Sequence, residues 1–337
     1  MNDLGGKRIV VTGGAGFIGS ALLWALNRRG ISDVLVVDRL RDDDKWKNLA
    51  PLQFWDFVDA DEFLLRIDAD ATQFGPIGTI FHLGACSSTT ERDAAYLLRN
   101  NYEYTKRIAH WAIDRQHQMV YASSAATYGG LETDLSESRP LESLRPLNMY
   151  AYSKQLFDLY AQRRGWLDHL TGVKYFNVFG PNEWHKRDMR SVVLKAFEQI
   201  RDTGSVKLFK SYRKEFRDGE QERDFLYVKD AVAMTLHLAD RGAAGIYNIG
   251  SGTAHTWLEL VRPIFANLNL PEKIEFIDMP PGLRAKYQYS TQASMEKLRA
   301  TGYDRAPAAL GDAVSDYVRN YLTGEAHLDP LHETSVV

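Results

Sequence analysis

Short apolar runs alternate with longer amphipathic stretches through the first half of the chain. Five runs rich in apolar residues read RIVVTG, DVLVVD, TIFHLGA, MVYASSA and VKYFNVFG. Between them lie stretches with apolar residues at helical spacing, such as GSALLWALNRRG and RNNYEYTKRIAHWAIDR. Strands that alternate with helices in this way are typical of a parallel sheet covered on both faces, and strands that are apolar at nearly every position are typical of burial on both sides. The pattern therefore predicts an α/β fold with a doubly wound parallel sheet.

The pattern becomes irregular after Pro181. Charged residues gather in KSYRKEFRDGEQERDF, which we interpret as a loop, and strand-like GIYNIGSG and helical TWLELVRPIFANL follow it. We predict a first domain over residues 1–180 that also receives a segment near 225–252. A smaller C-terminal lobe over 181–324 and a loosely held tail over 325–337 would complete the chain.

Composition and charge exclude several classes of function. Of the 337 residues, 45% are hydrophobic and 25% are charged, and the formal net charge of -3 gives no argument for binding nucleic acid or a membrane surface. No apolar run reaches the roughly 18 residues of a membrane-spanning helix. Cys86 is the single cysteine, which excludes an internal disulfide and suits a reducing cytoplasm. No cysteine and histidine cluster has zinc-binding spacing, so we expect no metal ion.

The stretch TGGAGFIGS joins the first predicted strand to the first predicted helix. Gly13 permits a tight turn, Gly16 lets the backbone approach a pyrophosphate, and Gly19 allows the helix to pack closely on the strand. The start of that helix offers free N–H groups and the positive end of its dipole to phosphates. Asp38 ends the next strand 19 residues after Gly19, where an acid accepts a hydrogen bond from the adenosine ribose. The spacing and its context predict a dinucleotide-binding turn.

The choice between NAD and NADP depends on the residues that follow Asp38. An acid at this position favours the ribose 2′-hydroxyl of NAD, whereas a neighbouring arginine accommodates the 2′-phosphate of NADP. Arg39 follows directly and Lys45 is close in sequence, although both also fit a solvated loop whose aspartates balance them. We predict NADP as the cofactor, with NAD as the alternative.

The stretch MYAYSKQLFDLY contains the main candidates for catalysis. Tyr150 and Lys154 are four residues apart, so on a helix both side chains lie on one face. Tyrosine alone is a poor base because its pKa is about 10, but a lysine ammonium and an oxidised nicotinamide both favour the phenolate. Ser124, after a predicted strand, can hold a substrate oxygen, although Ser123 competes for this role; Tyr152 lacks a lysine four residues later. The group predicts acid–base assistance to hydride transfer at a sugar hydroxyl.

These motifs occur together in a known family. TGGAGFIGS with Tyr150 and Lys154, together with RDFLYVKDA and GIYNIGSG, resembles the extended short-chain dehydrogenase/reductase family of nucleotide-sugar epimerases and dehydratases. The resemblance extends from about Arg8 to Tyr321 and implies a Rossmann domain, a C-terminal lobe that binds a nucleotide sugar, and a homo-oligomer. Dehydratases of the family carry an acidic pair just after the serine, where this chain reads AAT, so epimerisation is favoured.

Four further stretches narrow the resemblance to one group of these epimerases. FHLGACSSTTERD, YASSAATYGG, YFNVFGPNEWHKRDM and KYQYSTQAS are together similar to the epimerases that act at carbon 6 of an ADP-linked heptose used for lipopolysaccharide. In that group a hydride is removed from carbon 6 and returned to the other face of the ketone, so a base is needed on each side. Tyr150 matches the first base and Lys186 matches the lysine proposed as the second, while His185 is interpreted as structural.

The resemblance also implies which residues line the two binding sites. The residues expected at the cofactor are Gly13, Gly16, Phe17, Ile18, Gly19, Asp38, Arg39, Lys45, Leu83, Gly84, Ala85, Cys86, Ser87, Asn100, Tyr150, Lys154, Val178 and Lys186. Asn100 is expected on the nicotinamide side, and Cys86 as a small filler rather than a nucleophile. The residues expected at the substrate are Ser87, Ser88, Thr89, Asn177, Asp188, Lys195, Phe209, Arg223 and Tyr287. Arg223 suits the diphosphate because a guanidinium meets phosphate oxygens in pairs.

The chain departs from the group's pattern in three places. The small, glycine-rich surroundings of the second lysine are replaced by Trp184, Arg187 and Asp188, and the loop over residues 210–222 is long and charged. A second cofactor-contacting lysine of the group falls near Ala60 and is missing. Another NAD(P)-dependent nucleotide-sugar epimerase or reductase is therefore the alternative function. A non-catalytic cofactor-binding protein is disfavoured because the tyrosine and lysine pair is present.

Overall fold

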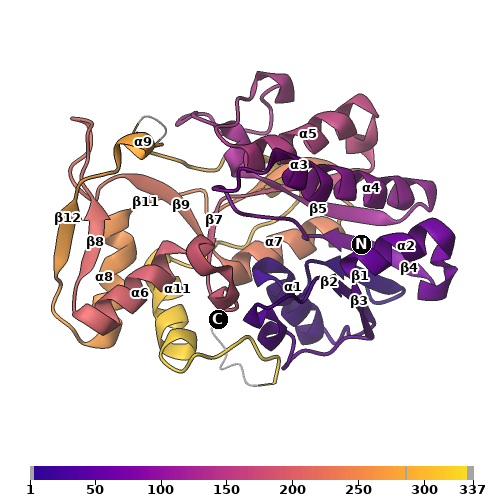
Figure 1. Ribbon diagram of the computed structural model, residues 1–337, viewed down its shortest axis with the longest axis horizontal. Helices are drawn as coiled ribbons and strands as arrows, with labels where there is room; N and C mark the ends of the chain where they lie inside the picture. Colours follow the sequence, from indigo (N-terminus) through magenta and orange to yellow (C-terminus); the bar gives the residue numbers. More distant parts are fainter. Residues whose placement is uncertain (1–3, 285–286, 332–337) are drawn as a thin grey trace.

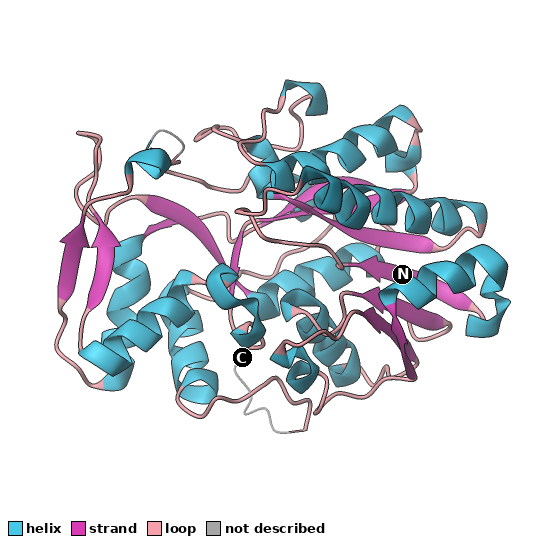
Figure 2. Cartoon of the chain, in the orientation of Figure 1, coloured by secondary structure: helices cyan, strands magenta, loops and turns pink. Residues whose placement is uncertain are grey.

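A parallel sheet forms the centre of the computed structural model, which describes residues 4–284 and 287–331 (Figures 1 and 2). Within these residues, seven strands lie in the order β3-β2-β1-β4-β5-β6-β10, and all neighbouring pairs are parallel. The chain reverses its direction across the sheet between β1 and β4, which opens a crevice at the carboxyl ends of these strands. The predicted doubly wound α/β fold is confirmed. The strands are β1 (Arg8–Thr12), β2 (Val34–Asp38), β3 (Asp56–Asp59), β4 (Ile77–His82), β5 (Gln118–Ser124), β6 (Leu170–Tyr175) and β10 (Gly245–Ile249).

Helices cover both faces of this sheet, and successive strand residues point to opposite faces. Val10 and Leu35 pack into one buried cluster, whereas their neighbours Val11 and Val36 pack into another. Burial on both sides explains why these strands are apolar at consecutive positions. One face carries α1 (Phe17–Arg28) and α7 (Val228–Asp240), and the other carries α2 (Ala60–Asp70), α4 (Tyr104–Asp114) and α5 (Met149–Arg163).

The sequence pattern did not predict β3. This strand lies at the edge of the sheet and pairs only with β2 in the described part of the chain. Of its four residues only Val58 is buried, because one edge and much of both faces are open to solvent. A strand of this kind leaves no continuous apolar run in the sequence, so hydrophobic patterning does not detect it.

The remaining segments form a smaller part beside the sheet, at the left of Figure 1. It contains a three-stranded sheet in the order β11-β9-β7 and a parallel pair of β8 and β12. These strands are β7 (Asn177–Phe179), β8 (Val206–Phe209), β9 (Glu222–Tyr227), β11 (Ala254–Thr256) and β12 (Ile274–Ile277). The helices of the smaller part are α6 (Val192–Thr203), α8 (Trp257–Leu268), α9 (Pro281–Arg284) and α11 (Leu310–Tyr317). Beside the central sheet, α3 (Ala94–Leu97) contacts α5, and α10 (Glu296–Ala300) contacts β10.

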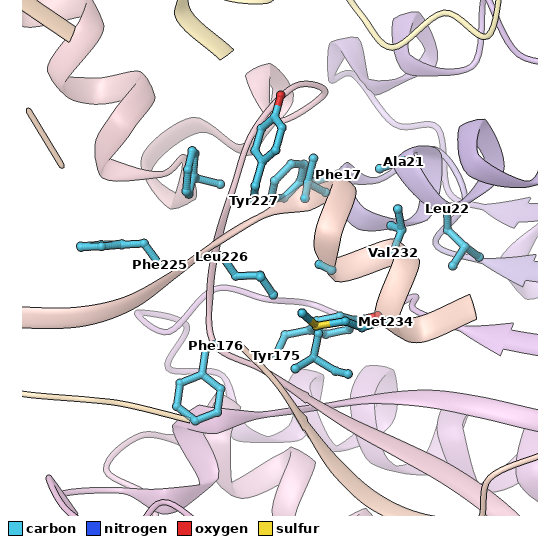
Figure 3. Close-up of a cluster of buried hydrophobic side chains, with 14 of the residues drawn as sticks. Phe17, Ala21, Leu22, Tyr175, Phe176, Phe225, Leu226, Tyr227, Val232 and Met234 are labelled. Atoms are coloured by element: carbon cyan, nitrogen blue, oxygen red, sulfur yellow. The ribbon is translucent and has the colours of Figure 1, made fainter. Parts of the chain in front are cut away.

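One hydrophobic cluster joins the sheet to the smaller part (Figure 3). Phe17 and Leu22 of α1 and Val232 of α7 lie in the same cluster as Phe225 of β9. Residues 228–249 therefore return to the central sheet, where β10 pairs with β6. The expected division of the chain at residue 180 remains a prediction, but the shared core shows that both parts pack as neighbours.

The expected loose tail is wrong for its described part, residues 325–331; residues 332–337 lie outside the described residues. Leu328 is fully buried, and its N–H donates to Asn182 Oδ1 at 2.9 Å. His327 Nδ1 forms a 2.8 Å hydrogen bond with Asn48 Oδ1. Isolated apolar residues in a polar segment leave no periodic pattern, so hydrophobic patterning does not predict the burial of Leu328.

The described residues include neither a candidate membrane-spanning helix nor a candidate metal-binding cluster. None of the described helices is both long enough and apolar enough to cross a membrane. Within residues 4–284 and 287–331, no three histidine, cysteine, aspartate or glutamate side chains are grouped so that they could hold a metal ion.

Candidate active site

A groove of about 830 Å³ lies at the carboxyl ends of the central strands and continues to the smaller part. It is lined by Ser124, Tyr150, Lys154 and Lys186, which come from β5, α5 and the 3-10 segment Trp184–Met189. The fold thus brings together the four predicted catalytic residues. The other predicted site residues that line it are Gly13, Gly16, Phe17, Ile18, Gly19, Asp38, Lys45, Leu83, Gly84, Ala85, Cys86, Ser87, Ser88, Thr89, Asn177, Val178 and Arg223.

The glycine turn packs too closely for any larger residue. Gly13 has φ +70°, and a Cβ added there would lie 2.6 Å from the backbone of Gly84. A Cβ on Gly19 would lie 2.0 Å from the Gly13 carbonyl oxygen. Gly16 precedes the twelve-residue helix α1 without a side-chain cap, so the first N–H groups of the helix are left for a ligand. Such a cradle fits the pyrophosphate of a dinucleotide.

Asp38 ends β2 beside this turn and is 8% exposed. Its Oδ2 accepts a 2.9 Å hydrogen bond from the Ala15 N–H. Its Oδ1 accepts from the Arg39 N–H at 2.7 Å and from Lys45 Nζ at 2.9 Å. A smaller cavity of about 180 Å³ opens here, and Asp38, Arg39, Arg41 and Lys45 all line it. This end of the groove therefore combines an acid for a ribose with three basic side chains.

Asn100 lies at this end of the groove, beside Asp38, and its expected place on the nicotinamide side remains a prediction. Arg39 Nη1 donates to Asn100 Oδ1 at 2.6 Å, and the two residues line the cavity of Asp38. The neighbouring Asn101 faces elsewhere: its side-chain amide accepts from the Cys86 N–H at 2.8 Å and donates to the Cys86 carbonyl at 2.9 Å. Both asparagines lie in the π-helical turn Leu98–Glu103, whose extra residue per turn redirects adjacent side chains. Sequence reasoning missed Asn101, because a change of helical type has no simple sequence signal.

Tyr150 lies in the first turn of α5. Asn148 caps this helix, with its Oδ1 accepting from the Ala151 N–H at 2.8 Å, and so sets where the helix begins. Ser124 lines the groove together with Tyr150, and its Oγ accepts from the Ala126 N–H at 3.1 Å. Burial raises the pKa of Tyr150, and the nearby Ser124 side chain acts in the opposite direction. A phenolate at Tyr150 therefore needs positive charge nearby.

Lys154 is the residue placed to supply part of that charge. It lies on α5 one turn beyond Tyr150, as the spacing predicts, and is 6% exposed. Its Nζ donates to the Ala122 carbonyl of β5 at 2.9 Å, and both residues line the groove. Burial lowers the pKa of Lys154 to about 8, so the ammonium form still predominates at neutral pH.

The structure separates the two serines that the sequence left as alternatives. The Ser123 hydroxyl donates to Asp158 Oδ2 at 2.7 Å. The same oxygen accepts from Lys174 Nζ at 2.7 Å, and the side chains of this ion pair are 0% and 1% exposed. Ser123 is thus engaged in a buried charge network, whereas the Ser124 side chain lies near Tyr150. Ser124 is the serine that is placed to meet a substrate oxygen.

Lys186 approaches the groove from the smaller part. Its Nζ lies 5.0 Å from the centroid of the Phe17 ring. Burial lowers the pKa of Lys186, and the nearby Glu183 opposes this shift. Glu183 is fully buried and accepts from the Ser191 N–H at 2.5 Å and the Ser191 hydroxyl at 2.6 Å, which anchors the segment that carries Lys186. A lysine with a lowered pKa is suited to exchange a proton.

A guanidinium and two aromatic rings meet at the far end of the groove. Arg223 Cζ lies 5.0 Å from the Tyr287 ring centroid and 5.8 Å from that of Trp257. Trp257 Nε1 donates to the Tyr287 hydroxyl at 2.9 Å. Flat rings with a guanidinium suit the base and phosphates of a nucleotide. Trp257 was missed, although TWLE carries a capping box, Thr256 with Glu259, that places this tryptophan in the first turn of a helix.

Tyr287 is not itself among the described residues that line the groove, although it contacts Arg223 and Trp257, which are. Three further predicted substrate residues are also absent from the described lining: Asp188, Lys195 and Phe209. Lys195 Nζ donates to the Asp188 carbonyl at 2.5 Å, and the Asp188 side chain is exposed. Phe209 ends β8, and its carbonyl accepts from Gln221. A role for these three residues in binding substrate remains a prediction.

Comparisons with known proteins agree with this geometry. The chain is 47% identical over 331 residues to a protein of Nitratidesulfovibrio vulgaris (strain DP4) named ADP-L-glycero-D-manno-heptose-6-epimerase, covering 96% of this chain and 99% of that protein. A protein of Fusobacterium nucleatum with the same name is 44% identical over 333 residues, covering 94% of this chain and 98% of that one.

Solved structures extend the comparison to the fold. The crystal structure of ADP-L-glycero-D-manno-heptose-6-epimerase of Helicobacter pylori matches with a TM-score of 0.79 and 26% identity, covering 95% of this chain and 98% of that one. A UDP-N-acetylglucosamine 4-epimerase of Methanobrevibacter ruminantium matches with a TM-score of 0.80 and 24% identity, covering 96% and 100%, which shows a shared fold. The model of the NAD dependent epimerase/dehydratase family matches residues 9–250, which include the glycine turn, Tyr150, Lys154 and Lys186. The chain therefore belongs to the NAD dependent epimerase/dehydratase family.

Proposed function

We propose that this protein interconverts ADP-D-glycero-D-manno-heptose and ADP-L-glycero-D-manno-heptose by transient oxidation at carbon 6. The observation that carries the proposal is the similarity to relatives named for this epimer, at 44–47% identity over 94–96% of the chain. Tyr150 and Lys186 reach one groove from different segments, which supports a reaction that needs two bases. The product would supply the heptose of lipopolysaccharide.

The residues of the groove would divide the reaction between them. Ser124 would hold the hydroxyl oxygen of carbon 6 and Tyr150, as the phenolate, would take its proton. The ammonium of Lys154 favours that phenolate by charge. When bound, the nicotinamide supplies an acceptor that takes a hydride from carbon 6 and returns it to the resulting ketone. Once the ketone has turned its other face, Lys186 would donate the proton that completes the inverted alcohol.

The cofactor we propose is NADP. Lys45 pairs with Asp38, so the acid that would repel a 2′-phosphate is partly neutralised. Arg39, Arg41 and Lys45 line the adjoining cavity, where they would contact that phosphate. Arg39 is also engaged by Asp61, the residue after Ala60, so it is less available than its position in the sequence implies.

Lys45 provides a test of this preference. Lys45→Ala is expected to raise the Kd of NADP about tenfold and that of NAD much less, because a charge-assisted contact to phosphate is lost. Titration of both cofactors against both proteins measures this. Lys47→Ala is the matched control, since Lys47 is 47% exposed and pairs with Asp44 instead. Tighter binding of NAD than of NADP by the unchanged protein would contradict the proposal.

A proton NMR time course in deuterated water tests the reaction. The protein with its cofactor is expected to convert ADP-D-glycero-D-manno-heptose to the carbon-6 epimer without deuterium at that carbon, because the same hydride returns. Epimer that carries deuterium would indicate exchange of a proton with solvent and would overturn the oxidation mechanism. No conversion, with cofactor demonstrably bound, would overturn the choice of substrate.

A second candidate function is epimerisation or reduction of another nucleotide sugar. The residues around Lys186 depart from the group's pattern at Trp184 and Arg187. A UDP-N-acetylglucosamine 4-epimerase shares the fold over nearly the whole length of both chains. Thermal stabilisation by a panel of ADP-, GDP-, UDP- and dTDP-sugars would separate the candidates, because a ligand of the native state raises apparent stability. Homo-oligomerisation and a cytoplasmic location remain predictions.

A further inference from the structure

A buried asparagine lies where four separate segments meet. Asn48, at the end of the 3-10 segment Asp44–Asn48, is 1% exposed. Its Nδ2 donates to the Ala15 carbonyl of the glycine turn at 2.9 Å and to the Asn182 carbonyl at 3.0 Å. His185 Nδ1 lies 3.3 Å from the same nitrogen, and His327 Nδ1 donates to Asn48 Oδ1 at 2.8 Å. One side-chain amide therefore links both walls of the cofactor groove to the C-terminal segment.

A second buried asparagine strengthens this junction. Asn182 is 0% exposed and has φ +75°, a backbone conformation that a non-glycine residue adopts only where its surroundings hold it. Its Nδ2 donates to the Ser20 hydroxyl in α1 at 2.9 Å, and its Oδ1 accepts from the Leu328 N–H at 2.9 Å. Asn182 directly precedes Glu183, which anchors the segment of Lys186. The segment carrying the second base is thereby tied to the glycine turn.

The C-terminal segment holds these contacts together. Leu328 is fully buried, and in Figure 1 the yellow chain beyond α11 passes back toward α1. His327 and Leu328 each contact one of the two buried asparagines. Burial of a whole leucine side chain stabilises the folded chain, so this segment is anchored more firmly than its polar sequence implies.

We propose that Asn48, His327 and Leu328 form a clasp that closes the cofactor groove and retains the dinucleotide between the two hydride transfers. The clasp joins Ala15, which lies under the pyrophosphate cradle, to the segment of Lys186 on the opposite wall. Separation of these walls would widen the groove and speed the release of a bound dinucleotide. Retention matters for an epimerase because the hydride taken from the substrate must return to the same molecule. The inference rests on nicotinamide binding and does not depend on the heptose.

The release rate of bound NADPH tests the clasp directly. Protein loaded with NADPH is mixed with excess NADP, and the loss of bound-cofactor fluorescence is followed. A chain ending at Ala326 is expected to release NADPH at least tenfold faster than the full chain. A chain ending at Leu331, whose side chain is 77% exposed, is the matched control and is expected to release it at the full-chain rate.

Single substitutions keep the test decisive if the shorter chain does not fold. His327→Ala removes one hydrogen bond and is expected to speed release about fivefold, whereas His327→Asn, which keeps a donor near the Nδ1 position, is expected to stay within about twofold. Circular dichroism at the assay temperature establishes that each variant is folded. Unchanged release from folded His327→Ala protein would overturn the proposal, and so would equally fast release from the chain ending at Leu331. Neither result would affect the choice of sugar, which the NMR time course decides.

Discussion

Replacing Tyr150 with phenylalanine is expected to lower kcat by about 10²–10⁴-fold, the usual contribution of a positioned acid–base group. The substitution removes the hydroxyl near Ser124 and leaves the ring in the first turn of α5. KM is expected to change little, because the lost hydroxyl acts on proton transfer in the transition state and not on binding of the nucleotide. Steady-state epimerisation and the content of bound cofactor are the two measurements.

Tyr152 offers a control on the same helix. Its side chain is 45% exposed, and it is absent from the described residues that line the groove. Tyr152→Phe is therefore expected to leave kcat and KM unchanged. Activity of the Tyr150→Phe protein within tenfold of the unchanged protein, with cofactor bound, would remove Tyr150 from the position of base.

Replacing Lys186 with methionine is expected to stop epimerisation almost completely while leaving the first oxidation intact. If Tyr150 serves one side of carbon 6 and Lys186 the other, the variant would still produce reduced cofactor from substrate. It would then return the hydride only to the original face, and kcat for epimer formation would fall by about 10²–10⁴-fold. Absorbance of the reduced cofactor in a single turnover, followed beside epimer formation by NMR, measures the two steps separately.

A lysine that only contacts phosphate would behave differently. Its loss would raise KM and leave kcat nearly unchanged, because ground state and transition state would lose the same interaction. That outcome would assign Lys186 to substrate binding and would leave the second base to be found. Lys207→Met is the control for loss of a lysine from the smaller part, since Lys207 is exposed on β8.

The described positions of the site explain how far sequence reasoning reached. Residues placed by local spacing were located correctly: Gly13 and Gly19 form the close turn, and Lys154 follows Tyr150 by one turn of α5. Asn100 contacts Arg39 whereas Asn101 contacts Cys86, because both lie in a π-helical turn that changes which way adjacent side chains point. A pattern that assumes 3.6 residues per turn has no means of detecting that change.

Long-range contacts account for most of the residues that were missed. Asn48 acts through hydrogen bonds to Ala15 and Asn182, and none of these positions is near another in sequence. Trp257 became a site residue only because β9 brings Arg223 beside it. Leu328 is buried although the residues on either side of it are polar, since its N–H donates to Asn182 and its side chain packs into the main hydrophobic cluster.

The class of fold, the glycine turn and the tyrosine–lysine pair could be predicted from the sequence, because each depends on residues within one strand, turn or helix. The apolar strands had to be covered on both faces, and only glycine fits at Gly13, where an added Cβ would lie 2.6 Å from the Gly84 backbone. Only the tertiary structure distinguishes Ser124 from Ser123. The buried ion pair of Asp158 and Lys174 engages the Ser123 hydroxyl, and the Ser124 side chain is the one that lies near Tyr150. The same holds for the clasp, whose parts meet only when the whole chain has packed.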